Sequence, residues 1–145
     1  MSQLPFFAEI KPGVELEPME YVLTPEMVLY YAIGIDNRHP WFVENSPFGG
    51  PIAPPTMVHV DQLRFSYTRL IHRPEEAGVH TKYDAQYFNP ARVGEKITIR
   101  GRCVANTIRR GRRYVTLETE TFGEDGRPIA RYRDTHLVKY GKEEE

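Results

Sequence analysis

The chain has 145 residues, which suits a single domain and is long enough to bury a hydrophobic core. A net charge of −1 gives no overall attraction to nucleic acid or to an anionic membrane, and 40% apolar with 27% charged residues is the composition of a soluble globular protein. One cysteine, Cys103, excludes an intramolecular disulfide framework and a cysteine-rich zinc site. Without a signal peptide or an apolar run of about 20 residues, the expected location is the cytoplasm.

The first half of the chain predicts one short strand and one helix. Met19–Leu23 has the pattern of a strand. Thr24 can cap a helix and Pro25 suits its first position, because proline has no N–H to leave unpaired. Gly34 and Asn37 then permit the chain to leave the helix. Frequent proline and glycine predict an irregular segment from Trp41 to Pro55.

A second helix is predicted to begin at Pro55–Thr56 and to end before Pro74. Its apolar residues are spread widely around the helix, so we expect it to be largely buried. They are Met57, Val60, Leu63, Phe65, Tyr67, Leu70 and Ile71.

The second half changes to the two-residue period of strands, clearest in the alternation from Tyr114 to Glu120. The expected strands are His80–Phe88, Glu95–Ile108, Arg113–Phe122 and Ile129–Val138. We expect them to form a meander. The predicted class is α+β, a curled antiparallel sheet wrapped around a central buried helix. Residues 1–145 form one domain in this interpretation, with residues 141–145 disordered.

Five short motifs, in order along the chain, resemble the MaoC-like hydratase and dehydratase family of the hot-dog fold. They are Tyr31-Ala32, the turn Asp36–Pro40, Gly50–Ala53, Pro90–Glu95 and Asp125–Ala130. The resemblance extends from about Phe7 to Val138.

The resemblance implies a hot-dog domain that pairs with a second hot-dog domain, in a homodimer or a heterodimer, and that acts on a coenzyme A or carrier-protein thioester. The reaction in such families is the reversible syn addition of water to a 2-enoyl thioester, by acid–base catalysis with an oxyanion hole. No cofactor, no metal, no nucleic acid and no membrane partner is expected.

The catalytic residues implied by the family motif are displaced in this chain. With Pro40 aligned on the motif's proline, Asn37 falls on the catalytic aspartate and Phe42 on the catalytic histidine. An acid and a base are still present at Asp36 and His39, which we interpret as a relocated pair, with Asn37 holding the water or the substrate. The alternative for these residues is helix termination and loop packing.

The substrate-binding residues are expected around the start of the second helix. The expected set is Gly50, Ile52, Ala53, Thr56, Trp41, Phe42 and Tyr31. The family commonly places a glycine N–H donor where this chain has Pro55, which has none. Thr56 would then supply the donor, through its N–H or its hydroxyl. This Pro-Pro-Thr version resembles members that form the substrate-binding half of a two-chain hydratase.

Remaining polar residues are given mostly structural roles. Arg110 and Arg112 lie at a predicted hairpin and are candidates for binding coenzyme A phosphates, although a solvated turn is the simpler interpretation. His59, His80 and His136 are interpreted as structural, because the histidines lack the close spacing of a zinc motif.

Three functions therefore remain open from the sequence. The first is an enoyl-thioester hydratase or dehydratase that uses Asp36 and His39. The second is a non-catalytic acyl-CoA-binding subunit of a heteromeric hydratase, which the Phe42 and Pro55 departures favour. The third is a repurposed hot-dog thioesterase or polyketide-tailoring enzyme.

Overall fold

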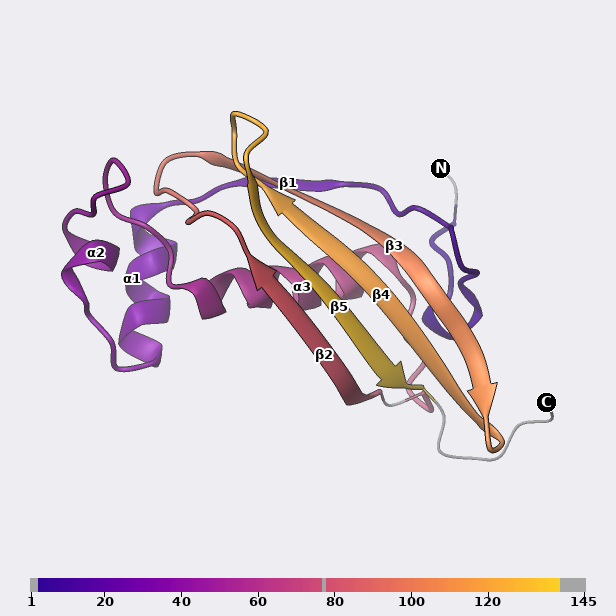
Figure 1. Cartoon of the computed structure of the whole chain (residues 1–145). Coiled ribbons are helices and arrows are strands. Elements are labelled where there is room, and N and C mark those ends of the chain that lie inside the picture. The colour runs from indigo at the N-terminus through magenta and orange to yellow at the C-terminus, as the bar shows by residue number, and fades with distance from the viewer. Residues whose placement is uncertain (1–2, 77, 139–145) are drawn as a thin grey trace.

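The computed structural model describes residues 3–76 and 78–138, as a twisted antiparallel sheet with one long helix across one of its faces (Figure 1). The described elements are the 3-10 helix η1 (Phe7–Glu9), β1 (Met19–Val22), α1 (Pro25–Gly34), α2 (Pro40–Val43), α3 (Pro55–Arg69), β2 (Val79–Tyr87), β3 (Lys96–Arg109), β4 (Arg112–Phe122) and β5 (Pro128–Leu137). These bounds lie within two residues of the predicted starts of both helices and all five strands. The predicted disorder of residues 141–145 lies outside the described residues.

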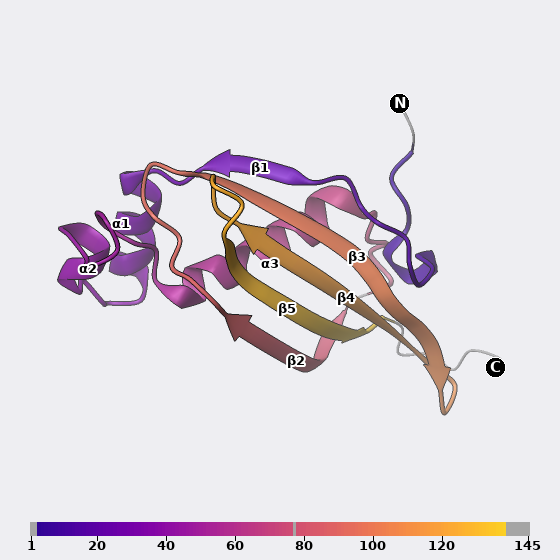
Figure 2. The ribbon, with the colours of Figure 1, turned by 45° about the horizontal axis from the view of Figure 1, so that its top comes forward.

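The sheet has the order β1-β3-β4-β5-β2, and every neighbouring pair is antiparallel. Three strands, β3, β4 and β5, form the predicted meander. The prediction was wrong for β2, which pairs with β5 instead of β3 and forms an edge of the sheet. The reason is that the chain between Tyr87 and Lys96 runs around the end of the sheet, past the ends of β5 and β4, before it enters β3 (Figure 2).

Helix α3 has Pro54 as its N-cap and Pro55 as its first residue, a position that suits proline because its φ angle is already helical. The helix lies along the inner face of the sheet (Figure 2). The prediction that it is largely buried was wrong. The helix buries one face, at Val58, Asp61, Gln62, Phe65 and Ser66. Val60 and Tyr67 are exposed, the latter by 68%, because they point away from the sheet.

The segment from Trp41 to Pro55 is not wholly irregular, because it contains the one-turn helix α2. Helices α1 and α2 lie together beyond one end of the sheet, beside the N-terminus of α3 (Figure 1). None of the helices in the described ranges has the length and apolar character that crossing a membrane requires.

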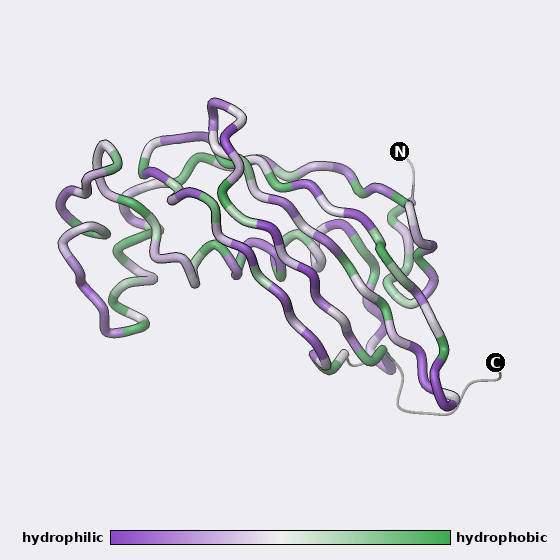
Figure 3. Tube along the Cα trace, in the orientation of Figure 1, coloured by the Kyte–Doolittle hydropathy of each residue, from purple (hydrophilic) through white to green (hydrophobic). Residues whose placement is uncertain are grey.

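The core lies between α3 and the inner face of the sheet, where the strands present alternate residues (Figure 3). Ile97 and Ile99 on β3 and Val115 and Leu117 on β4 are buried. Phe65 of α3 is fully buried among them. Its ring occupies the space that a side chain at position 101 of β3 would need. The glycine at this position therefore allows α3 to lie close to the sheet.

Gly101→Ala is expected to destabilise the protein by about 2 kcal/mol or more, because its Cβ would overlap the Phe65 ring and overpack the core. Gly34→Ala is the matched control, since an added Cβ at the end of α1 meets no heavy atom within 4 Å. Urea unfolding of both variants measures the effect. Equal midpoints for the two variants would contradict the packing argument.

Candidate functional site

The turn that ends α1 carries two of the predicted catalytic residues. Asp36 has a left-handed backbone with φ of 52°, and its N–H donates to the carbonyl of Ile33. The N–H of Asn37 donates to the carbonyl of Ala32 at 2.9 Å. These bonds satisfy carbonyl groups at the end of the helix, as in common C-terminal caps. Asp36 and Asn37 are both exposed, so the turn places the carboxylate at the surface.

His39 is held as the cap of α2. The side-chain oxygen of Asn37 accepts from the His39 N–H, and the His39 Nδ1 accepts from the Trp41 N–H at 3.2 Å. A neutral imidazole that accepts at Nδ1 carries its proton on Nε2. The His39 ring can therefore donate a hydrogen bond from Nε2 while Nδ1 accepts from the Trp41 N–H.

The predicted pair is close along the chain but is not joined. Among the described contacts, no hydrogen bond or ion pair links the Asp36 carboxylate to the His39 ring. The ring instead lies against Trp41 and Phe42, with centroids 5.4 and 5.7 Å away. The turn thus carries an exposed carboxylate at Asp36 and, three residues later, an imidazole that is held by contacts with the residues after it.

The first turn of α3 has few hydrogen-bond donors. Pro54 caps the helix and Pro55 is its first residue, so neither supplies an N–H. Thr56 is the first residue of the helix that carries one. Its Oγ1 accepts from the Tyr31 hydroxyl at 2.9 Å, which ties α1 to the start of α3. A donor for a substrate carbonyl at this helix end would come from Thr56, aided by the positive end of the helix dipole.

Beside this helix start lies an apolar pocket of about 230 Å³. It is lined by Phe48, Ile52, Ala53, Pro55, Val58, Tyr87, Phe88, Asn89, Pro90, Ala91 and Ile129. Whole-ligand pockets usually have about 300–1,000 Å³, so this space suits the apolar part of a ligand. Backbone bonds from Ala53 to Ala91 and from Phe88 to Ile129 hold its walls together.

Of the predicted substrate-binding residues, Ile52 and Ala53 line the pocket. Trp41 does not line it but packs edge-to-face against Phe48, which does; the two ring centroids are 5.8 Å apart. Phe42 is half-buried and packs against the core. Gly50 holds a turn with φ of 107°.

Sequence reasoning missed the pocket residues that come from elsewhere in the fold. Tyr87 is the last residue of β2, Phe88 comes directly after it, and Ile129 lies on β5. Nothing local in the sequence brings these strands to the start of α3, since the β2–β5 pairing is not between consecutive strands.

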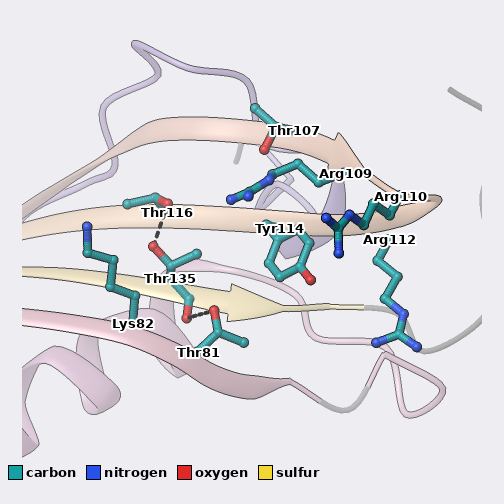
Figure 4. Close-up of a pocket in the computed structure, with 9 residues that line it drawn as sticks. All are labelled: Thr81, Lys82, Thr107, Arg109, Arg110, Arg112, Tyr114, Thr116 and Thr135. Atoms are coloured by element: carbon teal, nitrogen blue, oxygen red, sulfur yellow. Dashed lines mark hydrogen bonds between the residues drawn. The ribbon is translucent and has the colours of Figure 1, made fainter.

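Arg110 and Arg112 lie far from this pocket. They line a groove of about 780 Å³ on the outer face of the sheet, together with Lys82, Arg109 and several hydroxyl groups (Figure 4). The groove is at the β3–β4 hairpin, at the opposite end of the sheet from α1 and α2 (Figure 1). A thioester in this chain's own pocket would therefore not place its phosphates at Arg110 and Arg112.

One buried carboxylate on α3 lies outside the pocket. Asp61 is 3% exposed and accepts a 2.5 Å hydrogen bond from the hydroxyl of Tyr21 on β1. Burial raises the pKa of Asp61 to about 6, against the opposing effects of the Tyr21 bond and of Arg64. This carboxyl group joins α3 to the edge strand β1 and is a structural contact.

The raised pKa makes stability depend on pH. The folded state holds the Asp61 proton up to about pH 6, whereas the unfolded chain releases it near about pH 4. Stability from this group is therefore greatest below that window and falls by on the order of 2 kcal/mol as the pH rises through it. Asp61→Asn should remove this slope, which urea unfolding at several pH values measures. Asp84→Asn, at an exposed position, is the control; the same slope in both variants would contradict the assignment.

Comparison with known proteins identifies one matching family and several solved structures of similar fold. The family model described as "FAS1-like, dehydratase domain region" matches residues 11–132. No curated protein sequence matches the chain significantly.

Three solved structures illustrate the fold. The MaoC-like dehydratase from Rhodospirillum rubrum has a TM-score of 0.75 at 16% identity, covering 94% of this chain and 98% of that one. The (R)-hydratase PhaJ1 from Pseudomonas aeruginosa has a TM-score of 0.77 at 13% identity, covering 96% and 88%. The HadBC (3R)-hydroxyacyl-ACP dehydratase complex from Mycobacterium tuberculosis has a TM-score of 0.72 at 17% identity, covering 87% and 96%. At these identities the likeness shows the fold, which is the predicted hot-dog architecture.

Proposed function

The chain belongs to the FAS1-like dehydratase-domain family, a MaoC-like hydratase and dehydratase family of the hot-dog fold, and on that premise we propose that it is the acyl-thioester-binding half of a two-chain hydratase or dehydratase. The acyl group would occupy the apolar pocket between α3 and the end of β2. The thioester carbonyl would lie at the first turn of α3, where Thr56 is the first N–H donor. The reaction served would be the reversible hydration of a 2-enoyl thioester.

The hydrogen bond from the Trp41 N–H to the His39 Nδ1 carries this proposal. A general base for hydration must take a proton from water. His39 in this geometry already holds its proton on Nε2 and uses Nδ1 as a cap, so it is poorly placed to act as that base. The absence of an N–H at Pro55 points the same way, because it leaves Thr56 alone at the oxyanion position. The acid and the base would then come from the partner chain.

The free side of β2 supports a partner of the same fold. β2 pairs with β5 on one side, and within the described residues its other side has no strand. Val79, Tyr83 and Tyr87 on β2, and Phe88 directly after it, are each 40–50% exposed. A long edge strand with apolar side chains is a template for pairing with another chain. We propose that a second hot-dog chain pairs along β2, as a heterodimer; the HadBC complex is a heteromeric example among the structural neighbours.

A second candidate is a self-contained hydratase or dehydratase with Asp36 and His39 as catalytic residues and Asn37 as a water or substrate ligand. One observation favours it: His39 is exposed and uses Nδ1 as an acceptor, so its Nε2–H can donate a hydrogen bond to the hydroxyl group of a substrate. Asp36 on the same exposed turn would have to supply the base.

Turnover measurements separate the two candidates. Loss of enoyl absorbance with a panel of 2-enoyl-coenzyme A thioesters should be absent for the purified chain alone. It should appear when the second hot-dog chain that co-purifies with it is added. Turnover by the chain alone that falls about 100-fold or more in Asp36→Asn and His39→Asn would establish the second candidate instead.

Pairing along β2 is tested by the oligomeric state. Val79→Glu places a charge on the β2 edge and should weaken association with the second hot-dog chain at least tenfold, as measured by sedimentation of the two chains mixed at several concentrations. Val22→Glu is the matched control, because Val22 is 52% exposed on β1 at the opposite edge of the sheet. Equal dimer affinities for the two variants would show that the chains do not pair through β2.

A further inference from the structure

The fold brings two histidines and one aspartate together where β2 meets β5. Asp134 and His136 are two residues apart on β5, so their side chains share the inner face of the sheet. His80 lies opposite His136 in the β2–β5 register. No local pattern predicts this cluster, because His80 and Asp134 are 54 residues apart. It lies outside the apolar pocket, which none of its members lines.

The donor atoms of the cluster converge. The His80 Nδ1 is 2.9 Å from the Asp134 Oδ1, the His136 Nδ1 is 3.7 Å from the same oxygen, and the two Nε2 atoms are 3.1 Å apart. One donor from each residue falls within 4.8 Å of the others. Ligands of a tetrahedral zinc ion, with bonds near 2.0–2.2 Å, are about 3.3 Å apart. To reach that spacing, the two donor atoms that lie farthest apart would have to approach each other by about 1.5 Å or less.

Burial makes the cluster costly without a cation. The Asp134 side chain is 0% exposed, and its Oδ2 has no hydrogen-bond partner. The His136 Nδ1 is also buried without one. An ionised carboxylate in the interior costs several kcal/mol unless it is paired or coordinates a metal, and the half-exposed His80 contacts only Oδ1 of Asp134.

The surroundings hold two of the three donors rigidly. The Phe7 ring meets the His136 ring edge-on at 5.4 Å, and an added Cβ at Gly78 would come within 3.2 Å of that ring. Asp134 is fixed in the middle of the sheet between β4 and β2. The His80 side chain, in contrast, is 45% exposed and offers a path to solvent. Rigid donors with one accessible ligand suit an ion that enters from outside.

We propose that His80, Asp134 and His136 form a binding site for a divalent transition-metal ion of the zinc type. Two imidazoles and one carboxylate are a donor set that zinc and its neighbours in the first transition row prefer. The ion would satisfy the buried carboxylate and would link the edge strand β2 to β5. Three protein donors leave a coordination position for water or for a group of the partner chain.

The experiment uses the untagged full-length protein, stripped with a chelator and dialysed. Calorimetric titration with Zn²⁺ should show one ion bound per chain, and Co²⁺ should give the visible d–d bands of a site with nitrogen and oxygen ligands. His80→Asn and Asp134→Asn should each weaken Zn²⁺ binding at least tenfold. His72→Asn is the matched control and should not, because His72 stacks on Phe7, contacts Ser66 and contributes no donor to the cluster.

The alternative to be excluded is a hydrogen-bonded cluster that binds no ion. No stoichiometric Zn²⁺ binding by the wild-type protein would establish that alternative and overturn the proposal. Equal affinity in wild type and His80→Asn would also overturn it, since the ion would then be bound elsewhere on the surface. His80 is half-exposed, so this variant should fold even if Asp134→Asn does not, and it decides the question alone.

Discussion

The packing of Phe65 against the bare backbone at Gly101 sets the geometry of this domain. It allows α3 to lie close to β3, and the inner faces of β3 and β4 then close around the helix. Because the helix is rigid, this contact also fixes where its first turn lies, beside the loop that follows β2. The pocket therefore depends on a contact three helical turns away. A change in the packing would move Thr56 and Val58 together relative to Tyr87 and Ile129.

The two sides of α3 differ in chemistry. Toward β3 and β4 the interface includes the buried apolar side chains of Phe65, Ile97 and Leu117. Toward β5 and β2 it holds histidine, tyrosine and Asp134, with the His59 ring 4.6 Å from the Tyr83 ring. The apolar side supplies stability, and the polar side adjoins the edge strand that is proposed to meet a partner. This division explains how a small domain can keep a firm core and still carry polar groups near an interface.

The sequence predicted the elements well because their signals are local. Thr24 and Pro25 mark the start of α1, and the alternation from Tyr114 to Glu120 marks β4. The place of β2 in the sheet was not predictable, since pairing between strands far apart leaves no local pattern. The burial of α3 was misjudged for a similar reason. Its buried face includes Asp61, whose partner Tyr21 lies 40 residues earlier on β1.

The same distinction holds for the site. Ile52 and Ala53 were predicted because they precede the helix in a motif, whereas Tyr87 and Ile129 reach the pocket only through the fold. Asp36, Asn37 and His39 were predicted as a catalytic group, which stays a prediction; the structure adds the hydrogen bonds of the turn that carries them. The hydrogen bond from the Trp41 N–H to the His39 Nδ1 could not be predicted from the sequence, yet it determines which ring nitrogen accepts a hydrogen bond and which can donate one.

The central claim, that the apolar pocket receives the acyl group of a thioester, is tested most directly by ligand binding reported from Trp41. This is the one tryptophan of the chain, and its ring touches Phe48 at the pocket wall. Titration with an unreactive alkyl-coenzyme A thioether should change its fluorescence saturably. Val58→Phe, which fills the pocket, should weaken that binding at least tenfold. A change that does not saturate, or an equal affinity in the variant, would contradict the account.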